Sequence, residues 1–261
     1  MQISLWNAQA GLEAQQRTLD IVADNVANLS TPGFKKARAD FTEAMYTVAA
    51  GNQPGTRAAL AMGPGTPPVI ADRLLVQGAL VPTGQPYDLA IVGPGYFVLQ
   101  DDQGQLAYTR AGHFALDGNY QLTDGAGHLV MGEAAPGATP APIVLNGTTG
   151  TPTLAPDGTI TYTDAQGQVH TAGRLVLAGF ANERGLVMGP DGLWHETAAS
   201  GPARQVSAPG TTVVQGQLEQ SNVDMGEEMV AAMMAERVYQ ISARALGIAD
   251  EMIQQVNALP R

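Results

Sequence analysis

The chain has 261 residues, no cysteine, 14% charged residues and a net charge of −11. The acidic balance excludes the basic surface that nucleic-acid binding requires, and the lack of cysteine excludes disulfides, thiolate metal sites and cysteine nucleophiles. The sequence contains no run of about 20 apolar residues that could insert into a membrane, and its N-terminus lacks the pattern of a cleaved signal peptide.

The first thirty residues repeat every seven positions. Two positions of the repeat form an a/d stripe: Leu5, Leu12, Leu19 and Val26, and three residues later Ala8, Gln15, Val22 and Leu29. This pattern predicts a helix over about 3–28 that ends before Pro32 and Gly33. Such a helix buries one narrow stripe and needs a partner.

The other end of the chain offers that partner. Asp224 and Glu227 resemble a capping box and predict a helix over about 224–258. An alternation of three and four residues there selects Ala231, Met234, Val238, Ile241, Ala245, Ile248, Met252 and Leu259. We therefore expect residues 1–33 and 221–261 to form one discontinuous, coiled-coil-like helical domain.

Residues 34–68 are predicted to connect this domain to the middle of the chain. The spacing of Phe34, Ala37, Phe41, Met45 and Val48 fits either a helix or an extended arm. Residues 50–68 are rich in glycine, proline and alanine and favour turns and polyproline geometry. A loop of this kind is either disordered or packed against something outside its own domain.

Residues 69–220 have the pattern of an antiparallel β domain. Short β segments such as 96–99 and 159–163 are separated at roughly ten-residue intervals by turn signals such as Asp124-Gly125 and Asp157-Gly158. No helix of useful length is predicted there. The fold class is therefore α+β, with a mainly antiparallel β domain inserted between the two helical ends.

Several segments resemble the signatures of bacterial flagellar rod and hook proteins. They are residues 20–35 (DIVADNVANLSTPGFK), 89–97 (LAIVGPGYF), 107–114 (AYTRAGHF), 217–223 (QLEQSNV) and the stretches 227–229 and 236–239. They occur in the family's order, so the resemblance covers most of the chain. Within the family, the chain length favours a distal rod subunit over the longer hook protein, with a proximal rod subunit as the nearer competitor.

The resemblance implies a structural subunit with no cofactor. Copies of the chain would form a hollow helical tube that transmits motor torque to the hook, and would contact other rod and hook proteins and bushing-ring proteins. The terminal helices would form the inner layer, the β domain would lie outside, and residues 46–68 would touch neighbouring subunits and stiffen the rod. The expected interface residues are Leu5, Leu12, Leu19, Val22, Val26, Leu29, Met234, Val238, Ile241, Ile248, Met252 and Leu259.

The resemblance also implies passage through the flagellar type III export apparatus to the basal body, without cleavage of a signal. Rod and hook subunits contain a Phe-x-x-x-hydrophobic element that engages the export gate, and Phe41 and Met45 fit it. The alternative interpretation is that these two side chains only pack on one another, as residues four apart in a helix do.

Catalytic and metal-binding patterns are weak. The four histidines, at positions 113, 128, 170 and 195, lack metal-ligand spacing. Asp101, Asp102, Asp117 and Asp124 could supply the carboxylate pair of a glycoside hydrolase, but each lies in a turn or beside glycine, and we interpret them as turn residues. The chain is thus not expected to be an enzyme. A β-rich cell-wall glycan-binding or glycan-hydrolysing protein and a non-flagellar fibre subunit remain alternatives.

Overall fold

The chain is organised in two units. One contains the two terminal helices, and the other contains most of the β-strands. The computed structural model describes residues 2–41, 69–135, 137–148, 150–206 and 211–258. The helical unit comprises Met1–Ala27, Lys36–Leu74 and Val223–Arg261, and the β-rich unit comprises Asn28–Lys35 and Leu75–Asn222. Two long helices and a large antiparallel sheet confirm the predicted α+β class.

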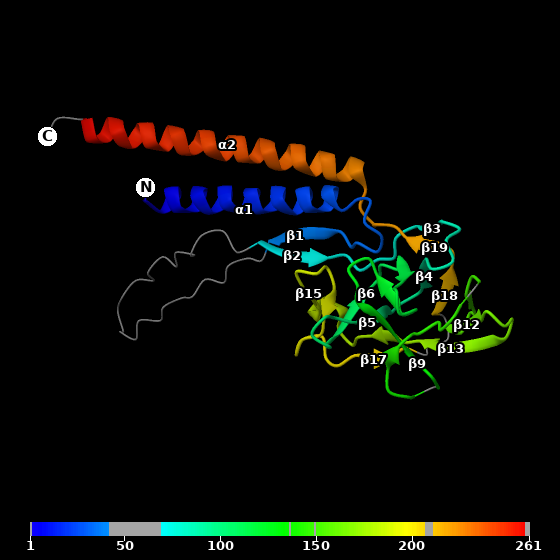
Figure 1. The fold of residues 1–261 in the computed structure, drawn as a ribbon. Coiled ribbons are helices and arrows are strands. Elements are labelled where there is room, and N and C mark those ends of the chain that lie inside the picture. Colours follow the sequence, from blue (N-terminus) through cyan, green and yellow to red (C-terminus); the bar gives the residue numbers. More distant parts are fainter. Residues whose placement is uncertain (1, 42–68, 136, 149, 207–210, 259–261) are drawn as a thin grey trace, which may run out of the picture. The chain divides into compact units, whose positions relative to one another are not determined.

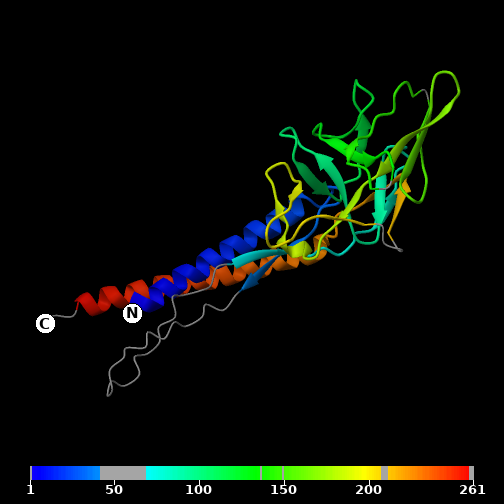
Figure 2. The ribbon, with the colours of Figure 1, turned by 90° about the horizontal axis from the view of Figure 1, so that it is seen from below.

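Both predicted helices are present in the helical unit. Helix α1 spans Gln2–Ala27 and helix α2 spans Met225–Ala258, each within a residue of the predicted bounds. Asp224 Oδ1 accepts hydrogen bonds from the backbone N–H groups of Gly226 (2.7 Å) and Glu227 (3.1 Å), so it caps α2 as predicted. The two helices lie side by side and run in opposite directions (Figures 1 and 2).

A two-stranded ribbon completes the helical unit. Strand β1 (Ala37–Phe41) pairs antiparallel with β2 (Val69–Arg73), and both strands contact α1 (Figure 1). The helical alternative for 34–48 is therefore wrong over 37–41, where the β2 backbone supplies the hydrogen-bonding partners. Strand β2 belongs to the helical unit, although the predicted β domain began at residue 69. Met45 and the segment 46–68 lie outside the described residues.

The β-rich unit consists of short strands and one 3₁₀ turn, Glu183–Gly185, among its described residues. Its strands are β3 (Leu80–Pro82), β4 (Leu89–Val92), β5 (Tyr96–Gln100), β6 (Leu106–Thr109), β7 (Phe114–Leu116), β8 (Leu122–Asp124), β9 (Leu129–Glu133), β10 (Ala141–Pro142), β11 (Thr153–Leu154), β12 (Thr159–Thr163), β13 (Val169–Leu175), β14 (Leu177–Gly179), β15 (Val187–Met188), β16 (Trp194–His195), β17 (Arg204–Gln205), β18 (Thr212–Gln215) and β19 (Gln217–Glu219).

The central strand of the main sheet, β5, is buried on both faces. The central path of this sheet runs β11-β12-β13-β9-β5-β6-β16-β15, and all its pairs are antiparallel. Successive side chains of a strand point to opposite faces. Phe97 and Leu99 of β5 accordingly pack in one apolar cluster, while Tyr96 and Val98 pack in a second cluster with Trp194. Two smaller ribbons, β18–β4 and β19–β3, accompany this sheet.

Candidate assembly interface

Asn25 of α1 forms hydrogen bonds to both strand β1 and helix α2. Its side-chain Nδ2 donates to the carbonyl oxygen of Ala37 (2.8 Å) and to Glu228 Oε2 (3.1 Å), and its Oδ1 accepts from the backbone N–H of Ala37 (2.9 Å). The amide thus pairs with both backbone groups of the first residue of β1, as a neighbouring strand would. Asn25 is 1% exposed, so these bonds are shielded from water.

Lys36 pairs with two acidic residues in the first turn of α2. Its Nζ lies 2.7 Å from Glu228 Oε1 and 3.0 Å from Glu227 Oε2. Burial lowers the pKa of Lys36, but hydrogen bonds and charges from Glu228 and Glu227 outweigh it, and the pKa lies above its ordinary value. Both oxygens of the buried Glu228 are therefore paired, one with Asn25 and one with Lys36. The acidic residues also suit the positive end of the helix dipole.

The buried face of α2 carries mostly small side chains. Glu228 (2% exposed), Ala235 (5% exposed) and the half-buried Ser242 follow one another at seven-residue intervals, on the face that contacts α1 through Asn25. Half-buried neighbours on this face are Ala231, Ala232 and Leu246. In the part of α1 whose side chains the structure describes, the buried apolar residues are Ala14 and Val22. Small side chains let the two helix axes approach closely.

The large apolar residues predicted for the α2 stripe lie on a different face. Their exposed fractions are Met234 66%, Val238 44%, Ile241 66%, Ile248 58% and Met252 54%. At about 100° per residue, this stripe lies roughly 110° around the helix from the buried face. The prediction that it packs on α1 within the same subunit is therefore wrong, because the small-residue face takes that place. We call the exposed surface formed by Val230, Met234, Val238, Ile241, Ile248 and Met252 the long apolar stripe.

A second group of exposed apolar residues flanks the buried face on its opposite side. Met225 (45% exposed), Met229 (51%) and Met233 (53%) follow one another at four-residue intervals over the first turns of α2. We call this group the short methionine stripe. An amphipathic helix of a finished globular domain buries its one apolar face. Helix α2 instead leaves two apolar stripes exposed, one on each side of its contact with α1.

The predicted residues of the N-terminal stripe are partly covered. Val22 is buried, and Leu12, Leu19 and Val26 are half-buried. Leu29 follows α1, belongs to the β-rich unit and is half-buried. The side chain of Leu5 and the whole of Leu259 lie outside the description, and the assembly role of all these positions stays a prediction.

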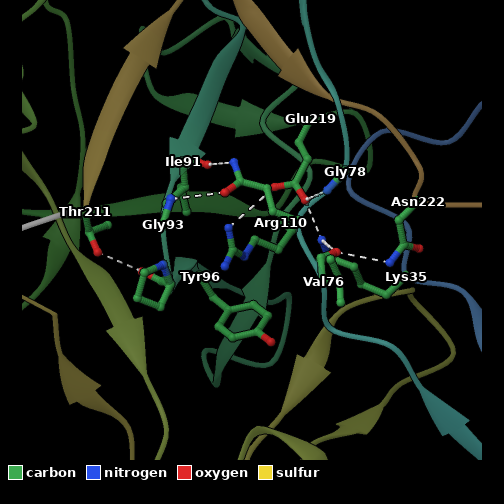
Figure 3. A network of polar contacts seen from close by, with 12 residues as sticks. Lys35, Val76, Gly78, Ile91, Gly93, Tyr96, Arg110, Thr211, Glu219 and Asn222 are labelled. Atoms are coloured by element: carbon green, nitrogen blue, oxygen red, sulfur yellow. Dashed lines mark hydrogen bonds and ion pairs between the residues drawn. The ribbon is translucent and has the colours of Figure 1, made fainter.

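In the β-rich unit, Glu219 of β19 lies between two cations (Figure 3). Its Oε1 accepts hydrogen bonds from Lys35 Nζ and from the backbone N–H of Gly78 (2.9 Å), and its Oε2 lies 3.5 Å from Nη1 of Arg110. The three side chains are at most 5% exposed. Arg110 also lies over the ring of Tyr96, 5.2 Å from its centroid.

This buried cluster contains two cations and one anion. Burial lowers the pKa of Lys35, and although Glu219 opposes the effect, the net result lies below the ordinary value. Lys35 Nζ also donates to the carbonyl oxygen of Val76 (2.9 Å), which accepts a second bond from Asn222 Nδ2 (3.0 Å; Figure 3). Through these bonds the cluster links the chain segments that contain Lys35, Val76 and Asn222.

Sequence reasoning singled out the segments that contain these residues but missed their contacts. Lys35, Arg110 and Glu219 each lie in a different signature segment, and the spacing of the segments gives no sign that they meet. The need for glycine at position 33 likewise arises from contacts with residues that are distant in the sequence. Gly33 has a φ of +72°, its N–H donates to Glu219 O (2.7 Å), and a Cβ there would lie 2.5 Å from the Arg110 carbonyl carbon. Only glycine adopts this conformation at so close an approach.

The aspartates considered for glycoside hydrolysis form turns, as interpreted from the sequence. The Oδ1 atoms of Asp101, Asp117 and Asp124 each accept two backbone hydrogen bonds of 2.7–2.9 Å, from the residues two and four positions later. The described residues contain no group of three or more potential metal ligands. None of the described helices is long and apolar enough to cross a bilayer.

Three family models match the chain. "Flagella basal body rod protein" matches residues 5–35, "Flagellar hook protein FlgE/F/G D1 domain" matches 90–162, and "Flagellar basal body rod FlgEFG protein C-terminal" matches 214–259. These ranges cover the signature segments except for Leu89, and they confirm the resemblance.

Full-length relatives are named flagellar basal-body rod protein FlgG. Those from Buchnera aphidicola (subspecies Schizaphis graminum) and Caulobacter vibrioides are each 35% identical over 98% of this chain, and over 99% and 98% of their own lengths. The relative from Bacillus subtilis is 32% identical over 99% of both chains. The flagellar hook protein FlgE of Helicobacter mustelae is 33% identical over 49% of this chain and 30% of its own length. The chain belongs to the family of flagellar basal-body rod proteins.

Proposed function

We propose that this chain is the distal rod subunit of the flagellum, and that many copies assemble into the hollow helical shaft that transmits motor torque to the hook. Family membership makes the chain a structural component of the basal body. The distal position is supported by near full-length similarity to rod proteins named FlgG, whereas the hook protein FlgE matches over about half of the chain.

The observation that carries self-assembly is the pair of exposed apolar stripes on α2. Burying one large apolar side chain contributes about 1.5–3 kcal/mol, so several such residues on each of two faces favour contact with further helices. Because the stripes lie on opposite sides of the seam with α1, the partners on the two sides are different subunits. Contacts of this heterologous kind, when they do not close into a ring, build a helical filament.

The proposed arrangement places the terminal helices of neighbouring subunits in a coiled-coil-like inner layer, with the β-rich units outside. The long apolar stripe of one copy contacts the helices of the next, and Leu12, Leu19 and Val26 of α1 contribute to the same layer. Residues 46–68 contact neighbouring subunits and stiffen the rod. Other rod and hook proteins bind at the ends of the assembly, and bushing-ring proteins surround it.

We also propose that Phe41 and Met45 engage the gate of the flagellar type III export apparatus. Phe41 is the last residue of β1. Changing Phe41 to Ala is expected to reduce the amount of the chain secreted into the medium at least severalfold while its cellular amount is unchanged. If Phe41 and Met45 only pack on one another, the Phe41→Ala chain is secreted at the normal level.

Assembly is tested by two adjacent substitutions on α2. Ile241 lies in the long apolar stripe and is 66% exposed, whereas Gln240 is exposed on a polar part of the same turn and bonds Glu236 (3.1 Å). Ile241→Asp is expected to abolish polymerisation of the purified chain and motility of a complemented deletion strain. Gln240→Asp, with the same new residue, is expected to preserve both. Normal rods with Ile241→Asp would contradict the proposal.

A further inference from the structure

Both exposed stripes of α2 contain methionine. Of the chain's ten methionines, five lie in α2, and each is about half exposed or more: Met225 (45%), Met229 (51%), Met233 (53%), Met234 (66%) and Met252 (54%). Three form the short methionine stripe, and two lie in the long apolar stripe. By contrast, Met131 packs in the core of the β-rich unit at 4% exposure.

We propose that these five methionines are a modification site through which a peroxide prevents assembly of the free subunit. The proposal rests on the proposed self-assembly through α2. The thioether sulfur attacks one oxygen of hydrogen peroxide, a sulfur–oxygen bond forms, and the oxygen–oxygen bond breaks. The second oxygen leaves as water after proton transfer. The sulfur is oxidised by two electrons, and the peroxide is reduced by two.

The chemical consequence follows from where the sulfurs lie. Oxidation converts a flexible apolar side chain into a polar, chiral sulfoxide. Assembly as proposed transfers both stripes from water into contacts between helices, and a polar group buried without a hydrogen-bonding partner opposes that transfer. Because Met229 and Met234 lie on opposite sides of the α1 seam, oxidation modifies both contact faces of the same helix.

The same geometry makes the modification depend on the assembly state. In the free subunit the five residues are 45–66% exposed, so a small oxidant can approach them. In the assembled shaft the neighbouring helices cover them. We therefore expect peroxide to act on subunits before they are incorporated and to leave the finished assembly largely unmodified.

The test treats the purified full chain with hydrogen peroxide before and after polymerisation. Peptide mass spectrometry locates each added oxygen, sedimentation measures the critical concentration, and circular dichroism checks that the helices persist. In the free chain, the α2 methionines are expected to oxidise at least tenfold faster than Met131. The oxidised chain is expected to need at least a tenfold higher concentration to polymerise.

A matched variant replaces the five methionines by leucine, which keeps a similar volume but has no sulfur. It is expected to polymerise equally well with and without peroxide. A second variant that replaces only Met234 and Met252 is expected to recover part of the resistance, and it provides a milder change in case the fivefold variant folds poorly.

The inference is overturned if the chain with all five sulfoxides polymerises at the concentration of the untreated chain. It is also overturned if the leucine variant loses polymerisation on peroxide treatment as fully as the wild-type chain does. Both results leave the proposed function intact. An untreated chain that stays monomeric at every concentration removes the proposed self-assembly and this inference with it.

Discussion

The side-chain amide of Asn25 donates a hydrogen bond to the carboxylate of Glu228 over 3.1 Å, although the two residues are 203 positions apart in the chain. The bond joins the last turns of α1 to the first turn of α2. Since Asn25 also pairs with the backbone of Ala37, one side chain holds both helices and the ribbon together.

Replacing Asn25 by Ala is expected to destabilise the helical unit. The change leaves the backbone groups of Ala37 and one oxygen of the buried Glu228 without these partners, which costs about 3 kcal/mol in the free energy of unfolding. Urea unfolding of the chain, followed by circular dichroism, measures the loss. Gln16→Ala, at an exposed position of α1, is the control and should change stability by less than about 0.5 kcal/mol. Equal stability of the two variants would contradict the role of Asn25.

The buried charges around Glu219 predict unequal effects of two substitutions. Lys35→Met removes one cation and leaves Glu219 paired with Arg110, whereas Glu219→Gln leaves two cations without their anion. Removing the shared partner of buried charges costs about 3–5 kcal/mol, so Glu219→Gln should be clearly the more destabilising change. Fluorescence of the buried Trp194 during urea unfolding, in a background with Trp6 replaced by Phe, reports on the β-rich unit. A larger loss in the free energy of unfolding for Lys35→Met than for Glu219→Gln would contradict this explanation.

Gly112 lies where the chain has no room for a side chain. A Cβ there would lie 1.6 Å from the carbonyl oxygen of Leu89, whose N–H donates to the carbonyl oxygen of Gly112 (2.9 Å). Overpacking of this kind costs about 1–3 kcal/mol or more, and a backbone obstacle cannot rotate away. We expect Gly112→Ala to lower the melting temperature strongly or to prevent folding. Gly118→Ala, where a Cβ would meet nothing within 4 Å, should leave it nearly unchanged. Similar melting temperatures would refute this account.

His128 makes the stability of the β-rich unit depend on pH. Burial lowers the pKa of His128, but the hydrogen bond to Asp124 (2.8 Å) and the charges of Asp124, Asp191 and Asp102 outweigh it, so the pKa lies above its ordinary value of 6.5. A pKa raised in the folded state stabilises the fold fully below about pH 6.5, and this contribution is lost as the pH rises through the folded-state pKa.

The free energy of unfolding should therefore fall as the pH rises from below 6.5 through the folded-state pKa of His128, and His128→Asn should remove part of that fall. His113→Asn, at a side chain that is 66% exposed, is the matched control and should keep the part due to His128. Parallel stability curves for the chain and for His128→Asn would rule out this contribution.

Much of the fold could be predicted from the sequence because its signals are local. The bounds of α1 and α2 follow from periodicity and from the Asp224 cap, and the turn role of Asp117 follows from its neighbours. The β1–β2 ribbon was missed because its two strands are separated by residues 42–68, and the spacing of Phe34, Ala37 and Phe41 also fits a helix.

The seam of α2 could not be read from its apolar pattern. The alternation of apolar residues at intervals of three and four selects the most apolar stripe, which includes Met234 and Ile241. The contact with α1 instead uses the face of Ala235 and Ser242. Both faces have the same alternation of three and four residues, so periodicity cannot distinguish them. Long-range contacts such as Lys35 with Glu219 likewise have no local signal.

Hydrogen exchange of the free chain and of the polymer tests most directly whether the helical ends are completed only by neighbouring copies. We expect amides of α1 and α2 to exchange faster in the free chain than in the polymer, while the core strands of the β-rich unit are protected in both states. Helical amides that are equally protected in the free chain and in the polymer would contradict this account.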